Sequence, residues 1–232
     1  MNAETGLDRP HVFLPAEGDP TGPPLLLLHG TGGNERDLLP LRDHLSPRAA
    51  VLSVRGTVLE NGMPRFFRRV REGVFDEDDL RRRADELAEF VVTASGAYGI
   101  KDRSLVAVGF SNGANTTAVL LAGQDEFILR HFDSFFLIEG GFGPLGANIL
   151  QKPALKRCRF LVLRGDAPED EHPGVRESND YLARALESAA REFHLDFTSV
   201  VMRGAGHALP PKYEVLLGQW ARREMLPALD TK

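Results

Sequence analysis

Short apolar runs alternate along the chain with longer segments in which apolar positions recur every three or four residues. Nearly continuous apolar runs are typical of strands buried on both faces, and the longer pattern is typical of amphipathic helices. The alternation predicts an α/β fold, with a mostly parallel central sheet and helices on both faces. Strands are expected at Leu25–Leu28, Ala50–Val54, Ser104–Gly109, Ser134–Ile138, Phe160–Arg164 and Phe197–Met202, with an edge strand at His11–Leu14.

Helices are expected between these strands. Three sets of apolar residues at helical spacing mark them, and the last helix is expected to end near Pro227. The three sets are Leu80, Ala84, Leu87 and Val91; Leu182, Leu186, Ala189 and Phe193; and Val215, Leu216 and Trp220. Arg81, Arg82 and Arg83 fall on the opposite side of the first helix and predict a solvated face. No linker-like stretch divides the chain, so one domain over residues 1–232 is expected.

Composition excludes several classes of protein. The net charge of −5 argues against nucleic acid as the main partner. No apolar run reaches the length of about 18 residues that a membrane span needs. The amino-terminal residues lack the basic and apolar regions of a signal peptide, and Cys158 has no second cysteine with which to pair. These features predict a cytoplasmic protein.

The run from Leu105 ends in Gly109-Phe110-Ser111-Asn112-Gly113, and small residues suited to a helix start follow. This is the strand–turn–helix context in which G-x-S-x-G acts as a nucleophile elbow. The two glycines suit a sharp turn that holds the serine in strained geometry. The alternative is an ordinary turn in which Ser111 caps the helix. As a nucleophile, Ser111 would have the Asn112 N–H beside it as an oxyanion donor.

An earlier strand ends in His29-Gly30-Thr31-Gly32-Gly33. Such a loop can approach a ligand closely and aim its N–H groups at an anion, so the Thr31 N–H is the second expected oxyanion donor. The loop lacks the Gly-Lys-Ser/Thr ending of a phosphate-binding loop and the third glycine of a dinucleotide fingerprint, so no cofactor is expected and no metal either. His29 follows the strand too closely to move and is interpreted as structural.

The general base is expected late in the chain. His207, in Gly204-Ala205-Gly206-His207, lies on a flexible loop between the last strand and the last helix. Its place after the serine and an acid matches the hydrolase order Ser…acid…His. For the acid, Asp170 is favoured because it leaves the chain room to rise toward the histidine. Asp166 is the alternative, although it lies close to its strand and suits a turn equally well.

With these motifs the chain resembles the carboxylesterase/phospholipase branch of the α/β-hydrolases, which includes the acyl-protein thioesterases. Within that branch it is most similar to esterases linked to methylhydroquinone resistance. The matching segments are 29–35, 52–56, 58–69, 73–80, the Ser111 elbow and Gly206-His207. The resemblance implies an α/β-hydrolase fold and a homodimer. The chain departs from the family at Pro168, where the family has its acid, and in Glu139–Pro144, which borders the family's substrate cleft.

Together, the residues predict a serine hydrolase of small carboxylic esters or thioesters, with an acyl-enzyme on Ser111 and His207 as base. Phe66, Phe67 and Arg68 are candidate substrate-binding residues, because aromatics beside an arginine suit an aryl group and an anion. The alternative for this segment is a packed Phe pair with its arginines paired to nearby carboxylates. The alternative function is a hydrolase-fold protein that binds or senses quinone or phenolic ligands without hydrolysis.

Overall fold

The computed structural model of the chain describes a large part of its residues. They are residues 7–18, 22–71, 74–122, 132–140, 158–167 and 190–222, together with 180, 183, 184, 187 and 188.

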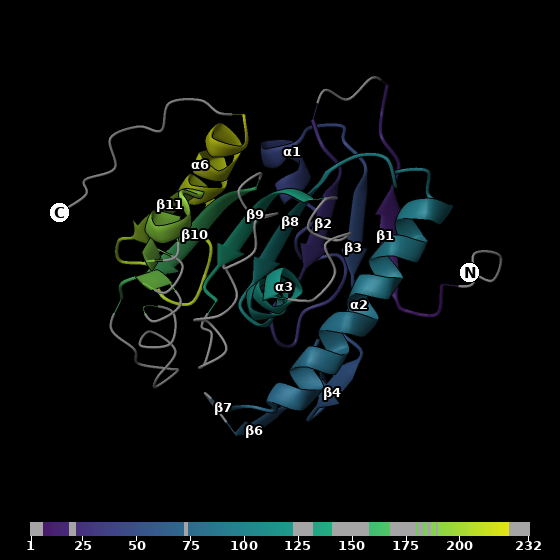
Figure 1. Cartoon of the computed structure of the whole chain (residues 1–232), viewed down its shortest axis with the longest axis horizontal. Coiled ribbons are helices and arrows are strands. Elements are labelled where there is room, and N and C mark those ends of the chain that lie inside the picture. Colours follow the sequence, from purple (N-terminus) through teal and green to yellow (C-terminus); the bar gives the residue numbers. More distant parts are fainter. Residues whose placement is uncertain are drawn as a thin grey trace.

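A central sheet organises the described residues (Figure 1). Its seven strands lie in the order β1-β3-β2-β8-β9-β10-β11, and only β1 runs antiparallel to its neighbour. Their bounds are β1 His11–Leu14, β2 Leu25–Leu28, β3 Val51–Val54, β8 Leu105–Phe110, β9 Phe132–Ile138, β10 Arg159–Gly165 and β11 Asp196–Met202. The sequence prediction of a mostly parallel sheet with an antiparallel edge strand is confirmed, with strand ends shifted by one or two residues.

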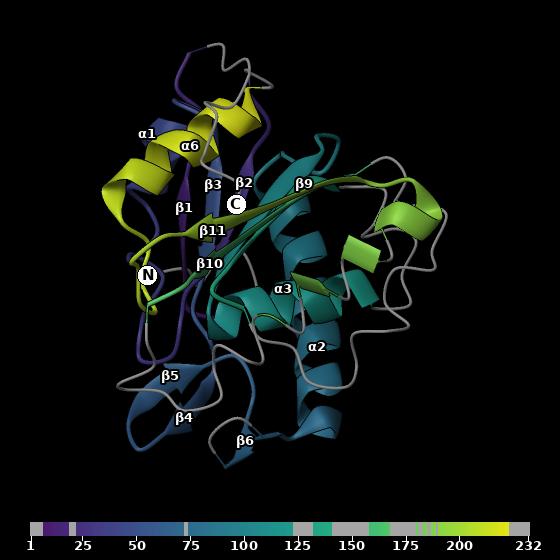
Figure 2. The same ribbon diagram turned by 90° about the vertical axis from the view of Figure 1, so that its left-hand side faces the viewer.

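Helices cover both faces of this sheet (Figure 2). Helices α1 and α6 contact each other on one face, and α2 and α3 do so on the other. Their bounds are α1 Leu41–Leu45, α2 Glu77–Ala97, α3 Asn112–Ala122 and α6 Pro211–Ala221. Residues 180, 183, 184, 187, 188 and 190–193 are also helical, as predicted. Helix α6 ends at Ala221, where the Arg222 N–H bonds the Gly218 carbonyl; Pro227 lies outside the described residues.

Each buried strand divides its side chains between two apolar cores. In β2, Leu26 and Leu28 pack with residues of α2 and α3, whereas Leu25 and Leu27 pack with residues of α1 and α6. Successive side chains of a strand point to opposite faces, so four consecutive leucines serve both cores. This explains why a continuous apolar run, rather than an alternating one, marks a strand in this chain.

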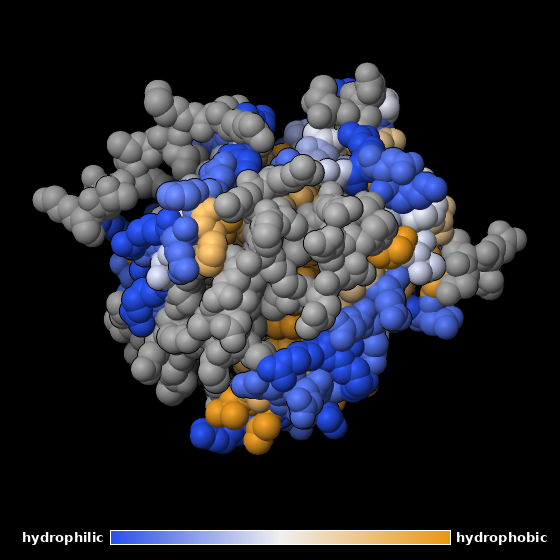
Figure 3. All heavy atoms as spheres, viewed as in Figure 1, coloured by the Kyte–Doolittle hydropathy of each residue, from blue (hydrophilic) through white to orange (hydrophobic). Residues whose placement is uncertain are grey.

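Helix α2 is amphipathic, as its sequence predicts. Leu80, Ala84, Leu87 and Val91 are buried. Asp76 caps the helix, since its side chain accepts a hydrogen bond of 3.0 Å from the Asp79 N–H. The opposite side carries charged residues and forms the hydrophilic band over α2 in Figure 3. Two of its arginines, Arg81 and Arg82, form ion pairs along the helix with Glu77 and Glu86, which agrees with a solvated face.

Two short hairpins lie between β3 and α2 in the chain. Strands β4 (Val58–Glu60) and β5 (Met63–Arg65) form the first, and β6 (Arg69–Arg71) and β7 (Val74–Phe75) form the second. The first hairpin lies against the loop after β2, since the Gly32 N–H donates to the Pro64 carbonyl at 2.9 Å. The sequence analysis did not predict these hairpins. Within the part of the chain described, no helix is long and apolar enough to cross a membrane.

Cys158 lies immediately before β10 and is buried. Its Sγ donates a hydrogen bond of 3.3 Å to the Phe132 carbonyl. Burial raises the pKa of the Cys158 thiol from 9.0 to about 11, with a smaller contribution from the Asp133 carboxylate. The residue is structural in its setting.

We expect Cys158 to react slowly with a disulfide reagent at pH 8. The thiolate is the reacting species, and raising the thiol pKa by two units leaves about a hundredfold less of it than in the unfolded chain. The absorbance of the released thiol, followed with and without denaturant, measures both rates. Equally fast reaction of the folded protein would contradict the prediction.

Candidate active site

Ser111 occupies the turn between β8 and α3. Its backbone is left-handed, with φ of 52°, and its N–H donates to the Ile138 carbonyl of β9 at 2.8 Å. A side chain is rarely held in this conformation unless its surroundings impose it. A Cβ added to Gly109 would lie 2.5 Å from the Gly113 carbonyl oxygen, and one added to Gly113 would overlap the Leu28 carbonyl oxygen. The close packing of strand and helix therefore requires both glycines.

His207 lies on the loop between β11 and α6, as predicted. Its Nε2 is 2.7 Å from the Ser111 Oγ, a hydrogen-bonding distance. The ring also packs against Phe110, with the ring centroids 5.5 Å apart. The structure thus brings together the two residues predicted as nucleophile and base. A histidine in this position can accept the serine proton through Nε2 if Nδ1 carries the other ring proton.

A carboxylate that was not among the predicted acids lies on the other side of this ring. Oε2 of Glu139 is 3.6 Å from Nδ1 of His207. Glu139 follows β9 directly, and its residue is 4% exposed. From the family resemblance, Glu139–Pro144 was expected only to border the substrate cleft. An acidic residue at the carboxyl end of the strand beside β8 was the signal that could have found it.

The two predicted acids are placed differently. Asp166 follows β10, and its Oδ1 accepts a hydrogen bond of 2.6 Å from the Gly204 N–H. It therefore joins the β10 loop to the turn after β11, in agreement with the turn role considered for it. Asp170, the favoured acid, lies outside the described residues.

The loop after β2 approaches the nucleophile as predicted. A Cβ on Gly30 would lie 2.8 Å from the Phe110 ring and 3.4 Å from the Ser111 Cβ. Thr31 is fixed from the side of the first hairpin, because Nη1 of the buried Arg65 donates to its Oγ1 at 2.8 Å. This arrangement places the Gly30 backbone next to the serine, with Thr31 following it in the loop.

Asn112 begins α3 with its side chain buried. Its Oδ1 accepts a hydrogen bond of 2.8 Å from the Phe66 N–H. The contact connects the start of the helix with the segment that follows the first hairpin. The contact therefore helps to hold Asn112 in place. The backbone N–H of Asn112 is the other predicted oxyanion donor.

His29 is buried and structural, as interpreted from the sequence. Its Nδ1 is 2.5 Å from the Gly30 carbonyl oxygen, and its Nε2 accepts from the Gly56 N–H at 3.0 Å. These partners require the neutral ring protonated at Nδ1. Burial lowers the pKa of His29 below 6.5, although the Gly30 carbonyl and the charges of Asp37 and Glu35 oppose the shift.

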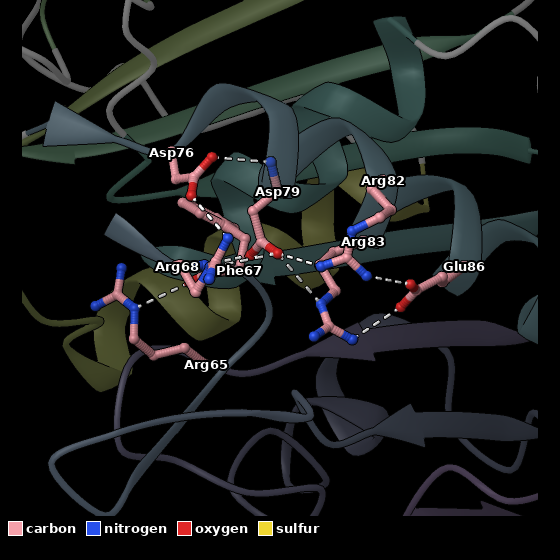
Figure 4. Close-up of polar contacts among 8 residues, drawn as sticks. All are labelled: Arg65, Phe67, Arg68, Asp76, Asp79, Arg82, Arg83 and Glu86. Atoms are coloured by element: carbon pink, nitrogen blue, oxygen red, sulfur yellow. Dashed lines mark hydrogen bonds and ion pairs between the residues drawn. The ribbon is translucent and has the colours of Figure 1, made fainter. Parts of the chain in front are cut away.

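Phe66, Phe67 and Arg68 do not occupy the place predicted for them. Phe66 is 1% and Phe67 0% exposed, and both belong to the core between the sheet and α2. The Arg68 side chain is 62% exposed and pairs with Asp76 at 3.1 Å, beside the buried Asp79 (Figure 4). The correction has a simple cause: packing two large apolar rings against α2 removes more apolar surface from water than a cleft wall would.

A cleft of about 550 Å³ opens beside His207 and Phe110, the residue before Ser111. Apolar side chains and two carboxylates contribute to its walls. The lining includes Thr31, Asp37, Leu38, Phe110, Leu209 and Glu214. Such a mixture of apolar walls and few polar groups is usual in small-molecule sites. In the described part of the chain, no three His, Cys, Asp or Glu side chains gather to hold a metal ion.

Comparisons with known proteins find a hydrolase and several esterases that are similar to this chain. No protein-family model matches the chain. Over 97 residues it is 58% identical to "Putative hydrolase MhqD" of Bacillus subtilis (strain 168), a match that covers 42% of this chain and 48% of that protein. The chain thus matches about half the length of this curated relative.

Solved structures match over nearly the whole chain. The carboxylesterase of Bacillus cereus is 34% identical, with a TM-score of 0.77 over 95% of this chain and 96% of that one. Acyl-protein thioesterase 2 of Zea mays is 16% identical and shares the fold, with a TM-score of 0.70 over 93% of this chain and 98% of that one.

Replacing Gly113 with Ala should destabilise the protein by about 1–3 kcal/mol or more, because the added Cβ meets the Leu28 backbone. The matched control is Gly96→Ala in α2, where nothing lies within 4 Å of the added atom. This control should stabilise the protein by up to about 1 kcal/mol. Urea unfolding measures both free energies, and equal stabilities for the two variants would refute the close packing at the elbow.

Acid should destabilise the protein partly through His29. Because its folded pKa lies below 6.5, the unfolded chain binds more protons below that pH, and the free energy of unfolding falls as the pH falls. His29→Gln should therefore lose less stability between pH 7.5 and 5.5 than the wild type. Urea unfolding at both pH values tests this. An identical loss in the variant would show that His29 is not the group concerned.

Proposed function

The chain belongs to the carboxylesterases of the α/β-hydrolase fold, and from this premise we propose that it hydrolyses a small carboxylic ester or thioester through Ser111. The observation that carries the proposal is the 2.7 Å distance between the Ser111 Oγ and the His207 Nε2. A serine is a weak nucleophile by itself, and an adjacent base is what activates it.

In the proposed reaction, the Ser111 Oγ attacks the carbonyl carbon while its proton passes to the His207 Nε2. The carbonyl oxygen becomes an oxyanion, which the Thr31 and Asn112 N–H groups stabilise. Each such donor is typically worth about 3–4 kcal/mol. Collapse of the intermediate breaks the bond to the leaving alcohol or thiol, which takes the proton from His207, and an acyl-enzyme remains.

Water then completes the cycle. His207 removes a proton from a water molecule, whose oxygen attacks the acyl carbon. The second tetrahedral intermediate collapses to the carboxylic acid, and the proton returns to the Ser111 Oγ. A carboxylate beside Nδ1 would hold the ring in the tautomer that both steps need. Asp170 remains a prediction for that acid.

The cleft supports a small and uncharged substrate. Leu38, Phe110 and Leu209 offer apolar surface for an acyl or aryl group. Asp37 and Glu214 line the same space and would repel an anionic substrate. A substrate of this kind also fits within about 550 Å³.

The alternative function, binding or sensing quinones or phenols without hydrolysis, rested on the departure from the family at Pro168, where the family has its acid. None of the contacts described at Ser111 and His207 favours it over hydrolysis. The homodimer and the cytoplasmic location remain predictions.

A fluorophosphonate probe tests the assignment of Ser111. Intact-protein mass spectrometry should show one adduct, and peptide mapping should place it on Ser111. Ser111→Ala should abolish labelling, and His207→Gln should slow it by about a thousandfold or more, because the serine loses its base. Ser104→Ala is the matched control, since Ser104 is exposed before β8 and should leave labelling unchanged. A folded wild type that takes up no probe would refute the serine-hydrolase proposal.

A further inference from the structure

We propose that Glu139 is a positioning residue for His207, and that its carboxylate orients the imidazole and stabilises the positive charge that the ring gains. The inference rests on the proposed function in one respect, namely that His207 accepts the Ser111 proton. The contact between Glu139 and the ring is itself a feature of the structure.

The two nitrogens of His207 face two different groups. Nε2 is 2.7 Å from the Ser111 Oγ, and Nδ1 is 3.6 Å from Oε2 of Glu139. A carboxylate accepts hydrogen bonds and cannot donate them when ionised, so it favours the tautomer with the proton on Nδ1. That tautomer leaves the lone pair on Nε2 free to take the proton of the serine hydroxyl.

The carboxylate of Glu139 is held in place by its surroundings. Its other oxygen, Oε1, accepts a hydrogen bond from the Gly165 N–H at the end of β10. The Glu139 N–H donates to the Leu163 carbonyl at 2.8 Å, so backbone and side chain are both attached to the same neighbouring strand. A carboxylate fixed in this way loses little further freedom when the ring becomes charged.

The backbone of Glu139 has an uncommon conformation. Its φ is 51°, in the left-handed region that favours glycine and costs about 1–3 kcal/mol for other residues. The residue before it, Ile138, accepts the hydrogen bond from the Ser111 N–H. The end of β9 therefore positions the nucleophile through its backbone and faces the base through the next side chain.

Transfer of the Ser111 proton would place a positive charge on His207 next to the Glu139 carboxylate. When Nε2 takes the proton from Ser111, the ring becomes an imidazolium beside the carboxylate of Glu139. The carboxylate stays ionised and the Nδ1 proton stays on the ring, so one proton moves and the site gains an ion pair. An opposite charge within about 4–6 Å favours the charged form of a titrating group. With Glu139 4% exposed, water screens this attraction weakly.

Other carboxylates line the cleft with this ring or attach to its loop, and a test of Glu139 must leave them unchanged. Asp37 and Glu214 line the cleft with His207. Asp166 is bonded to the Gly204 N–H on the loop that carries the ring. Asp170 lies outside the described residues, and a contribution from it would add to that of Glu139. A substitution at Glu139 alone leaves all of these in place.

Glu139→Gln is a suitable variant, because the amide oxygen can still accept from the Gly165 N–H while the charge is lost. NMR of the nitrogen-labelled histidine ring, assigned with His207→Gln and recorded where the ring is neutral, shows which ring nitrogen carries the proton and needs no substrate. We expect the fraction of His207 with its proton on Nδ1 to fall in Glu139→Gln, because the glutamine N–H group can donate to Nδ1 whereas a carboxylate only accepts. With an activated aryl ester, kcat/KM should fall about tenfold or more, with the loss in kcat rather than KM.

Two further variants make the result specific. Glu89→Gln removes the same charge from an exposed position on α2 and should leave the ring tautomer and kcat/KM as in the wild type. Glu139→Asp keeps the charge but withdraws it by one methylene, so its fraction of the Nδ1–H tautomer should lie between those of the wild type and Glu139→Gln. It provides the same test if Glu139→Gln fails to fold.

The outcomes separate the two proposals. A ring tautomer that is the same in the wild type, Glu139→Gln and Glu139→Asp overturns the role of Glu139, whatever the probe does at Ser111. A loss of the Nδ1–H tautomer in Glu139→Gln, in a protein whose Ser111 takes up no fluorophosphonate, supports the contact and refutes the proposed hydrolysis. A loss of this tautomer together with a lowered kcat supports both.

Discussion

The close approach of strand β8 to helix α3 is the constraint on which the candidate site depends. Gly109 has no side chain, so the backbone of α3 can start directly above the end of β8, and Gly113 lets the same turn of the helix lie against the Leu28 carbonyl of β2. Ser111 is left at the apex in a left-handed conformation, its N–H bonded to Ile138. Without this contact, neither the direction of the hydroxyl nor its distance from His207 would be fixed.

The parallel sheet gives the remaining groups their common edge. Strands β2, β8, β9, β10 and β11 all run in one direction, and the loop after each carries a group of the site or one that holds it. Two left-handed residues, Ser111 and Glu139, occupy adjacent strand ends. Each costs about 1–3 kcal/mol, which two apolar cores packed on the faces of the sheet offset. The site is thus strained where buried strands and their packed helices surround it.

The prediction from sequence succeeded where the signal was local. Runs such as Leu25–Leu28 predicted strands, and the spacing of Leu80 and Leu87 predicted α2, because burial on a given face fixes these patterns. It was wrong for Phe66 and Phe67, since an aromatic pair can line a cleft or fill a core and its sequence is the same in both cases. It also missed Glu139, because a carboxylate after a strand has no signature until its neighbours are known.

The sequence by itself determined the order of the strands along the chain, the elbow around Ser111 and the glycine-flanked loop of His207. These follow from periodicity and from the conformations that glycine allows, which are properties of short segments. Among the carboxylates that the structure describes, only the tertiary structure decided which one faces the histidine. It also decided that the Phe pair lies in the core. Such contacts join residues far apart in the chain, and their partners are set by sheet order and packing, which no local pattern encodes.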